Sequence, residues 1–356
     1  MRYVALDSCK EGMIVGKNVY GQNAMLLLRF GTTMRQYHID QLIRMGYPGV
    51  YIDDDMSHGI DIDLTVSELT RNNACKAVQE LFTSKLNGGA LGNERVVKEI
   101  EDVLVEIVAQ IVSNKDAVAN LAALKVFDNY TYQHCVDVGV LSVILGREFN
   151  MTKSMLVELG KAAFFHDIGK MFIPKNILTK PAPLTADEFD EIKKHPKLGY
   201  DCIVNNLGLS RLVAEGALYH HERYEGNGYP SGISGEDIPI FSRIIAAADA
   251  YDAITTKRAY RNAMVANEAY EYVMGNSGTQ FCPKVVEVFV RKVPPFTVGT
   301  GVILSDQRLA VVVENRPNFM MRPMVKLIKE TAEDPDTYID LATDVDSFSI
   351  TIVSVM

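Results

Sequence analysis

The chain has 356 residues, of which 47% are hydrophobic, and its formal net charge is −9 at pH 7. This length predicts about two or three domains, and the apolar content is ample for a buried core. The acidic balance argues against sequence-independent binding of a nucleic-acid polymer, which needs a basic surface, although an anionic small substrate stays compatible with locally concentrated positive charge.

The sequence also indicates in which cellular compartment the protein is expected. No apolar run approaches the roughly 18 residues that a membrane span needs, and residues 1–8 contain no apolar signal core. The five cysteines show no Cys-x-x-Cys spacing and are odd in number, which indicates reduced thiols. We therefore expect a cytoplasmic protein without a membrane segment.

Residues 1–65 predict a small α+β module whose sensory or structural role is open. Apolar runs at 13–15, 24–28 and 50–52 are typical of strands, and 33–45 is typical of a helix. The expected apolar side of that helix consists of Met34, Tyr37, Leu42 and Met45, whereas Ile39 falls outside it.

Residues 66–120 predict connecting helices. After Asn93, a plausible helix N-cap, apolar side chains recur at steps of three and four residues: Val96, Ile100, Val103, Leu104, Ile107, Val108 and Ile111. This pattern predicts a strongly amphipathic helix. Its apolar face fits either core packing or a helix pair with a second subunit, so a homodimer stays open.

Residues 121–293 predict the functional core, because they contain five of the seven histidines. His134 lies in a predicted helix. A second predicted helix leads through Phe164 into the pair His166–Asp167, which Lys170 follows closely.

Further histidines lie near expected helix ends. A capping box at Thr185–Glu188 predicts a helix that we expect to end at His195, because Pro196 follows as a stop signal. A helix over 212–219 is expected to end in His220–His221.

The loop and helix that follow complete this region. Two glycines and a proline predict a tight loop at 226–230, before a small-residue helix with Asp249 and Asp252. Singly, each histidine fits a core or surface residue. Together, imidazoles and carboxylates without cysteine are the ligand set typical of a hydrolytic metal site, not of a structural zinc.

Residues 294–356 predict a small β-rich appendage. Short β-rich runs, separated by turn residues, lie at 299–304, 309–314, 324–328, 338–341 and 348–354. None of these runs contains residues that suggest catalysis.

In their order, the motifs resemble the HD-GYP family, bacterial cyclic di-GMP phosphodiesterases within the HD phosphohydrolase superfamily. The resemblance covers about residues 125–290 and depends on His134, His166-Asp167-x-Gly-Lys170, His195-Pro, His220-His221-Glu-Arg, Gly228-Tyr229-Pro230, Asp249-Ala-Tyr-Asp252 and Arg258-x-Tyr-Arg261. We therefore expect a multi-domain, mainly α fold. It would consist of an all-helical HD-type metal-dependent phosphohydrolase core with the N-terminal α+β module and the C-terminal β-rich appendage.

The resemblance implies divalent metal ions, usually iron or manganese, held by seven side chains: His134, His166, Asp167, His195, His220, His221 and Asp249. It also implies that Lys170 stabilises phosphate charge and that Arg258 and Arg261 contact substrate phosphates. Without the resemblance, that arginine segment fits a solvated basic turn. Tyr229 is expected at the mouth of the site, and its loop could contact GGDEF-type signalling proteins.

Three positions depart from the family pattern. Members with a third metal have a glutamate one turn before the first histidine, where this chain has Tyr130. Two ions are therefore expected. The loop has Glu225 where an aspartate is usual, and Ala259 stands where a proline is usual. Both of these changes are conservative.

The expected activity is hydrolysis of the 3′,5′-phosphodiester of cyclic di-GMP to pGpG, with GMP as a further product left open. A metal-bridging hydroxide would attack, Asp167 would bridge the two ions, and Glu222 and Asp252 would orient ligand histidines. The alternatives are an HD phosphohydrolase of another cyclic dinucleotide and a catalytically inactive cyclic di-GMP receptor or docking module.

Overall fold

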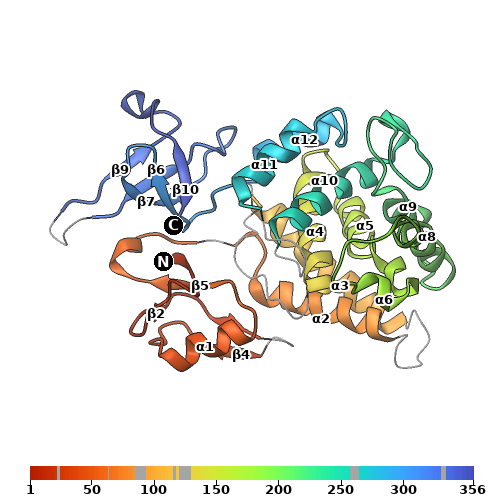
Figure 1. The fold of residues 1–356 in the computed structure, drawn as a ribbon, viewed down its shortest axis with the longest axis horizontal. Helices are drawn as coiled ribbons and strands as arrows, with labels where there is room; N and C mark the ends of the chain where they lie inside the picture. Colours follow the sequence, from red (N-terminus) through yellow and green to blue (C-terminus); the bar gives the residue numbers. More distant parts are fainter. Residues whose placement is uncertain are drawn as a thin grey trace. The chain divides into compact units, whose positions relative to one another are not determined.

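The computed structural model describes residues 1–21, 25–62, 64–84, 94–114, 118–119, 130–256, 264–329 and 334–356. These residues form two compact units (Figure 1). The strand-rich unit contains Met1–Thr65, Val118–Tyr130 and Val290–Met356, and the helical unit contains Val66–Ala117 and Thr131–Phe289. The division into four domains at 65, 120 and 293 stays a prediction.

The N-terminal part of the strand-rich unit is a short antiparallel sheet covered by one helix. The sheet has the order β1-β5-β2, with β1 at Arg2–Ala5, β5 at Gly49–Asp53 and β2 at Ile14–Val15. A hairpin joins β3 (Val19–Tyr20) to β4 (Leu26–Leu28), α1 spans Gln36–Arg44, and the 3-10 helix η2 spans Asp55–Ser57.

The expected apolar side of α1 was wrong in part. Ile39 and Leu42 are the buried residues of this helix, whereas Tyr37 is 54% exposed and Met45 is 37% exposed. Two overlapping apolar stripes compete on so short a helix, and packing against Val15 and Ile52 of the sheet selects the stripe that contains Ile39.

The C-terminal part is a five-stranded antiparallel sheet with the order β10-β6-β7-β8-β9. The strands are β6 (Gly301–Leu304), β7 (Leu309–Glu314), β8 (Met324–Leu327), β9 (Tyr338–Asp340) and β10 (Ile352–Val355). The expected β-rich character is confirmed. However, the last strand begins later than the run at 348–354 predicts, because the 3-10 helix η6 (Val345–Ser347) precedes it.

The two ends of the chain share a core in this unit. Tyr51, Ile60 and Ile62 form one buried cluster with Val311. The buried ammonium of Lys326 donates to the carbonyl oxygen of His58 at 2.9 Å. The N-terminal module and the C-terminal sheet are therefore parts of one compact body.

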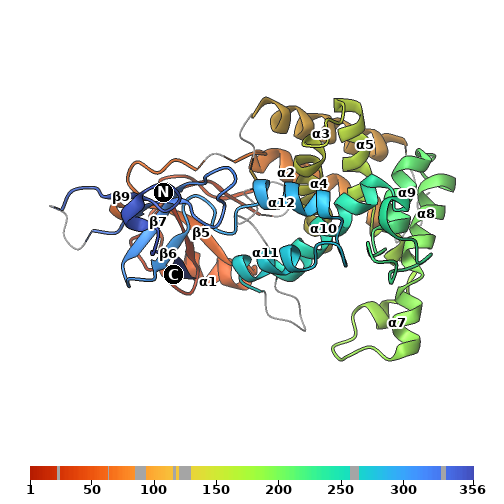
Figure 2. The same cartoon turned by 90° about the horizontal axis from the view of Figure 1, so that it is seen from above.

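The helical unit is built around helices that are apolar on nearly every side. Its helices are α2 (Glu68–Ser84), α3 (Glu94–Ser113), α4 (Tyr130–Arg147), α5 (Lys153–Phe164), α6 (Lys175–Leu178), α7 (Ala186–Ile192), α8 (His195–Asn205), α9 (Arg211–Tyr219), α10 (Ile240–Thr255), α11 (Ala266–Gly275) and α12 (Pro283–Lys292). The 3-10 helices are η4 (Ile168–Phe172) and η5 (Gly235–Asp237). Figure 2 shows α4 and α10 in the interior of this unit, while α7 extends from it.

The amphipathic helix α3 uses its apolar face inside the chain. The buried side chains of α3 include Ile100, Leu104 and Ile107, and the helix packs against α2 and α5. Core packing therefore accounts for this face without a second subunit.

A buried ion pair ties α2 to α4. The guanidinium of Arg71 donates to Asp137, one turn beyond His134, and both side chains are at most 9% exposed. Burial lowers the pKa of Arg71, but the charge of Asp137 outweighs this and holds the arginine protonated.

The expected end of a helix at His195 was wrong. His195 is the first residue of α8, and Pro196 lies in the first turn of the same helix. The N–H groups of a first turn have no partner within the helix, so proline costs nothing there and its fixed φ favours helix initiation. Among the described residues, no helix combines the length and apolar character that a membrane crossing requires.

Candidate metal centre

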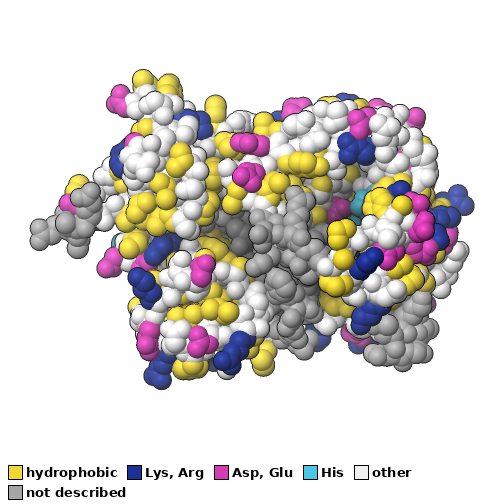
Figure 3. Space-filling model, viewed as in Figure 1, with side chains coloured by type: hydrophobic (Ala, Val, Ile, Leu, Met, Phe, Trp, Pro, Cys, Tyr) yellow, Lys and Arg dark blue, Asp and Glu magenta, His cyan; other side chains and the backbone are white. Residues whose placement is uncertain are grey.

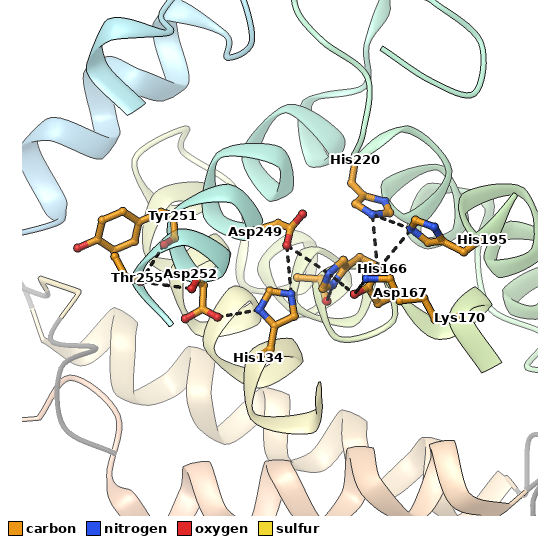
Figure 4. Close-up of polar contacts among 11 residues, drawn as sticks. His134, His166, Asp167, Lys170, His195, His220, Asp249, Tyr251, Asp252 and Thr255 are labelled. Carbon is orange, nitrogen blue, oxygen red and sulfur yellow. Dashed lines mark hydrogen bonds and ion pairs between the residues drawn. The ribbon is translucent and has the colours of Figure 1, made fainter. Parts of the chain in front are cut away.

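The seven predicted ligands lie together in the helical unit, on five different elements. Figure 4 labels all of them except His221. His134 lies on α4, the pair His166–Asp167 at the junction of α5 and η4, His195 at the start of α8, His220 and His221 at the end of α9, and Asp249 on α10. Three groups of these side chains have ligand atoms within 4.8 Å of one another. The groups are Asp167 with His195, His220 and His221; His134 with His166 and Asp167; and His166 with His220 and Asp249.

A glycine permits the closest approach in this arrangement. A Cβ at Gly169 would lie 1.9 Å from the carbonyl oxygen of His195 and 2.6 Å from the amide nitrogen of Gly199, so η4 lies directly against the first turn of α8. This contact brings Asp167 Oδ1 to 3.4 Å from His195 Nε2. The glycine two residues after Asp167 is therefore part of the site's construction.

Four histidines are oriented through Nδ1. In three of them Nδ1 lies within 2.7 Å of a main-chain carbonyl oxygen three residues earlier: Ala163 for His166, Ile192 for His195 and Ala217 for His220. Nδ1 of the fourth, His134, lies 2.7 Å from Asp252 Oδ2. With the ring proton on each Nδ1, Nε2 is the atom through which each of these histidines would bind a metal ion.

The expected orienting role of Asp252 agrees with this contact, but that of Glu222 was wrong. Glu222 Oε1 accepts from the amide groups of Ser231 and Gly232 at 2.7 and 3.0 Å, and so holds the loop after Tyr229. Nothing in the sequence distinguishes a carboxylate that faces a loop from one that faces an imidazole. The carbonyls of Ala163, Ile192 and Ala217 were also missed, because main-chain acceptors leave no residue-type signal.

Electrostatics differ between the two sides of the centre. Burial lowers the pKa of His134, but hydrogen bonds to Asp249 and Asp252 outweigh it and raise the pKa to about 9. His134 Nε2 lies 3.1 Å from Asp249 Oδ1, a distance at which a proton can join these two atoms when no metal ion lies between them. Burial lowers the pKa of His195 to about 4 and that of His221 to about 3, which keeps both rings neutral and ready to bind metal.

The carboxylates stay ionised, although Asp167 is buried and Asp249 is only 16% exposed. Burial raises the pKa of Asp167, but Lys170 and His166 hold it well below its usual range. His134 has the corresponding effect on the pKa of Asp249. Both Asp167 and Asp249 are therefore available as anionic ligands.

Buried atoms without partners test whether this set fits a metal ion. Among the described residues, His166 Nε2 and Asp167 Oδ1 are buried and have no hydrogen-bond partner. Leaving such atoms unpaired costs about 1–3 kcal/mol each. A divalent cation would satisfy both atoms, and the nitrogen and oxygen donors suit iron, manganese or zinc. The cluster can therefore hold metal.

A cavity of about 420 Å³ opens beside the cluster. His220, His221, Asp249 and Tyr229 are among its lining residues. The Tyr229 ring stacks on that of His221, with centroids 4.8 Å apart and an angle of 26°. Figure 3 shows histidine atoms next to acidic atoms at the surface of the helical unit.

The loop of Tyr229 lies close to the histidine segment. A Cβ at Gly228 would lie 2.4 Å from the amide nitrogen of Arg223, which explains the glycine there. Lys170 is one-third exposed and pairs with Asp167 Oδ2. Arg258, Arg261 and the side chain of Tyr130 lie outside the described residues.

Comparison with known proteins identifies the family of this chain. The HD domain model matches residues 106–285. Cyclic di-GMP phosphodiesterase PA4108 of Pseudomonas aeruginosa is 35% identical over 253 residues, which are 71% of this chain and 61% of that protein. The 3′3′-cGAMP-specific phosphodiesterase 2 of Vibrio cholerae is 34% identical over 180 residues, which are 50% of this chain and 34% of that protein. The chain thus spans less than two thirds of either relative.

A solved structure shares the fold. The HDG"Y"P protein Bd1817 of Bdellovibrio bacteriovorus has a TM-score of 0.53 at 18% identity, and the match covers 80% of this chain and 97% of that chain. At this identity the similarity is one of fold.

Proposed function

Because the chain belongs to the HD domain family, we propose that it is a metal-dependent phosphodiesterase that hydrolyses cyclic di-GMP to pGpG. The observation that carries the proposal is the buried set of histidines and aspartates beside a cavity of about 420 Å³. A relative that is 35% identical is named for this substrate. The turnover assay described below also tests whether GMP is released as a further product.

We propose two ions, iron or manganese, held by the seven side chains of the cluster. When bound, such ions supply Lewis-acid chemistry: they stabilise charge on the phosphate and lower the pKa of water, so that hydroxide can attack at neutral pH. The count of two rests on Tyr130 at the position of the family's third-site glutamate.

Three side chains of the protein itself have distinct roles in the proposed reaction. Asp167 Oδ1 lies 3.4 Å from His195 Nε2 and Oδ2 lies 3.4 Å from His166 Nε2, so the two oxygens of this carboxylate could each serve one ion. Asp252 fixes the ring of His134 and keeps its Nε2 directed at the centre. The Lys170 ammonium, partly exposed beside Asp167, is placed to neutralise charge that grows on the phosphate in the transition state.

Substrate contacts outside the centre are proposals as well. Tyr229 would form part of the cavity wall, and Arg258 and Arg261 would bind phosphate oxygens through paired hydrogen bonds. The loop of Tyr229 is also our proposed contact for GGDEF-type partners. A cytoplasmic location and a homodimer stay predictions.

A second substrate has specific support. The Vibrio cholerae relative is named as specific for 3′3′-cGAMP, another cyclic dinucleotide. Exchange of one guanine for adenine leaves the phosphodiester chemistry unchanged, so the same centre would serve either substrate.

The test combines metal analysis with turnover. Elemental analysis of the purified chain should find two ions of iron or manganese per chain, and the protein should convert cyclic di-GMP to pGpG. Parallel assays with 3′3′-cGAMP rank the two substrates by kcat/KM, and Asp167→Ala controls for contaminating activity. A metal-loaded protein that binds cyclic di-GMP but never cleaves either dinucleotide would instead support a receptor.

A further inference from the structure

An exposed aromatic ring lies in the wall of the cavity beside the candidate centre. Phe189, on α7, is 45% exposed and lines the same cavity as His220, His221 and Asp249. Single exposed apolar residues are common on protein surfaces, but an aromatic ring in the wall of a cavity, beside polar groups, can receive an apolar or aromatic ligand face.

The segment around Phe189 holds the ring in place. Thr185 and Glu188 form a capping box at the start of α7, and Lys180 pairs with Glu188 at 2.6 Å. The Lys193 ammonium lies 4.7 Å from the centroid of the Phe189 ring and 2.8 Å from Asp190 Oδ1. Lys193 also lines the cavity, and its ammonium lies over one face of the Phe189 ring in a cation–π contact.

Two amide side chains lie in the same wall. Asn227 and Gln280 line the cavity, and Gln280 Oε1 accepts from the hydroxyl of Tyr272 at 2.8 Å, which fixes that amide. The second aromatic residue of the wall, Tyr229, already has one face covered by His221. Phe189 is 45% exposed and Tyr229 is less exposed, so Phe189 offers the larger open ring surface to a ligand.

We propose that Phe189 and Lys193 form a purine-binding subsite, in which a base of the substrate stacks on Phe189 while its phosphate reaches the metal centre. The proposal rests on the proposed function for its substrate class. Nucleobases stack on aromatic side chains because every base has a π face. The O6 and N7 atoms of guanine are acceptors, so the ammonium of Lys193 can donate to a guanine edge.

Binding of GMP separates the base from the phosphate. Isothermal titration of the metal-loaded full chain is carried out with GMP and with inorganic phosphate, for wild type and for Phe189→Ala. We expect GMP to bind roughly 5- to 150-fold more weakly to the variant, while phosphate binding stays unchanged. Phe189→Tyr should restore GMP binding, whereas Phe189→Leu, which keeps apolar bulk without an aromatic face, should not.

A matched control uses Phe319, which is 53% exposed in the strand-rich unit. Phe319→Ala should leave GMP binding unchanged. Equal GMP affinity in wild type and Phe189→Ala, equal loss of GMP and phosphate binding, or no GMP binding by wild type would overturn the subsite. Wild-type protein that binds GMP through Phe189 yet leaves cyclic di-GMP intact would refute the proposed function and keep the subsite.

Discussion

Replacing Asp252 with alanine should weaken metal binding although it removes none of the predicted ligands. Asp252 Oδ2 lies 2.7 Å from His134 Nδ1, and their side chains are 1% and 3% exposed, so the contact is shielded from bulk water. His134 belongs to the ligand group with His166 and Asp167, but not to the group with His195, His220 and His221. One ion should therefore be lost before the other.

The size of the effect follows from the hydrogen bond. A hydrogen bond to a charged group contributes about 1.5–3 kcal/mol, which corresponds to a rise in Kd of roughly 10- to 150-fold. Loss of partners that orient metal ligands typically costs about 10- to 100-fold in metal affinity, which agrees. Asp252→Asn keeps an acceptor but loses the charge, so its Kd should lie between those of wild type and alanine.

The assay is metal content at a series of buffered free-metal concentrations, measured by elemental analysis. At intermediate concentrations, wild type should hold two ions and Asp252→Ala one. Asp201→Ala serves as the control. This half-exposed carboxylate on α8 pairs with Lys197 at a distance of 2.8 Å, and it is not one of the predicted ligands. Two ions bound with wild-type affinity in Asp252→Ala would refute the assignment of Asp252 to His134.

Further outcomes follow from other contacts. Asp167→Ala should lose both ions, whereas Lys170→Ala should keep them and lose roughly 100- to 1,000-fold in kcat, as parallel metal analysis and kinetics will show. Gly169→Ala places a Cβ 1.9 Å from the carbonyl oxygen of His195. The variant should lose about 1–3 kcal/mol of unfolding free energy in urea titrations and should bind less metal. An unchanged unfolding free energy and metal content would contradict the close contact between η4 and α8. Arg71→Ala removes the guanidinium that neutralises the buried carboxylate of Asp137 on α4. Thermal unfolding should therefore shift down by about 6–20 °C, and a shift under about 2 °C would show that the ion pair is not needed.

Residue types indicated which histidines and aspartates the fold brings together, because imidazoles and carboxylates carry their chemistry in the side chain. The assignment of all seven as metal ligands came from the family resemblance and stays a prediction. The helical periodicity of α3 likewise predicted Ile100, Leu104 and Ile107 as one face, and the structure buries all three. The β-rich pattern after residue 294 predicted the C-terminal sheet for the same reason, since both signals are local.

The errors came from choices that local patterns leave open. Pro196 either ends one helix or starts the next, and only the placement of His195 at the first position of α8 decides between them. Glu222 and Asp252 are the same type of group, and only the fold sets which one meets a histidine. Tertiary packing, not propensity, settled each of these cases.

The shared core of the strand-rich unit sets an order on folding during synthesis. Tyr51, Ile60 and Ile62 pack with Val311, which the ribosome adds about 250–260 residues later. At about 5–20 residues per second, that delay lasts on the order of 13–50 s, whereas the segments of the helical unit are complete once Phe289 has been added. The nascent chain can therefore bring the candidate metal ligands together while apolar side chains of the N-terminal module are still uncovered, because the C-terminal strands that pack on them have not yet been synthesised.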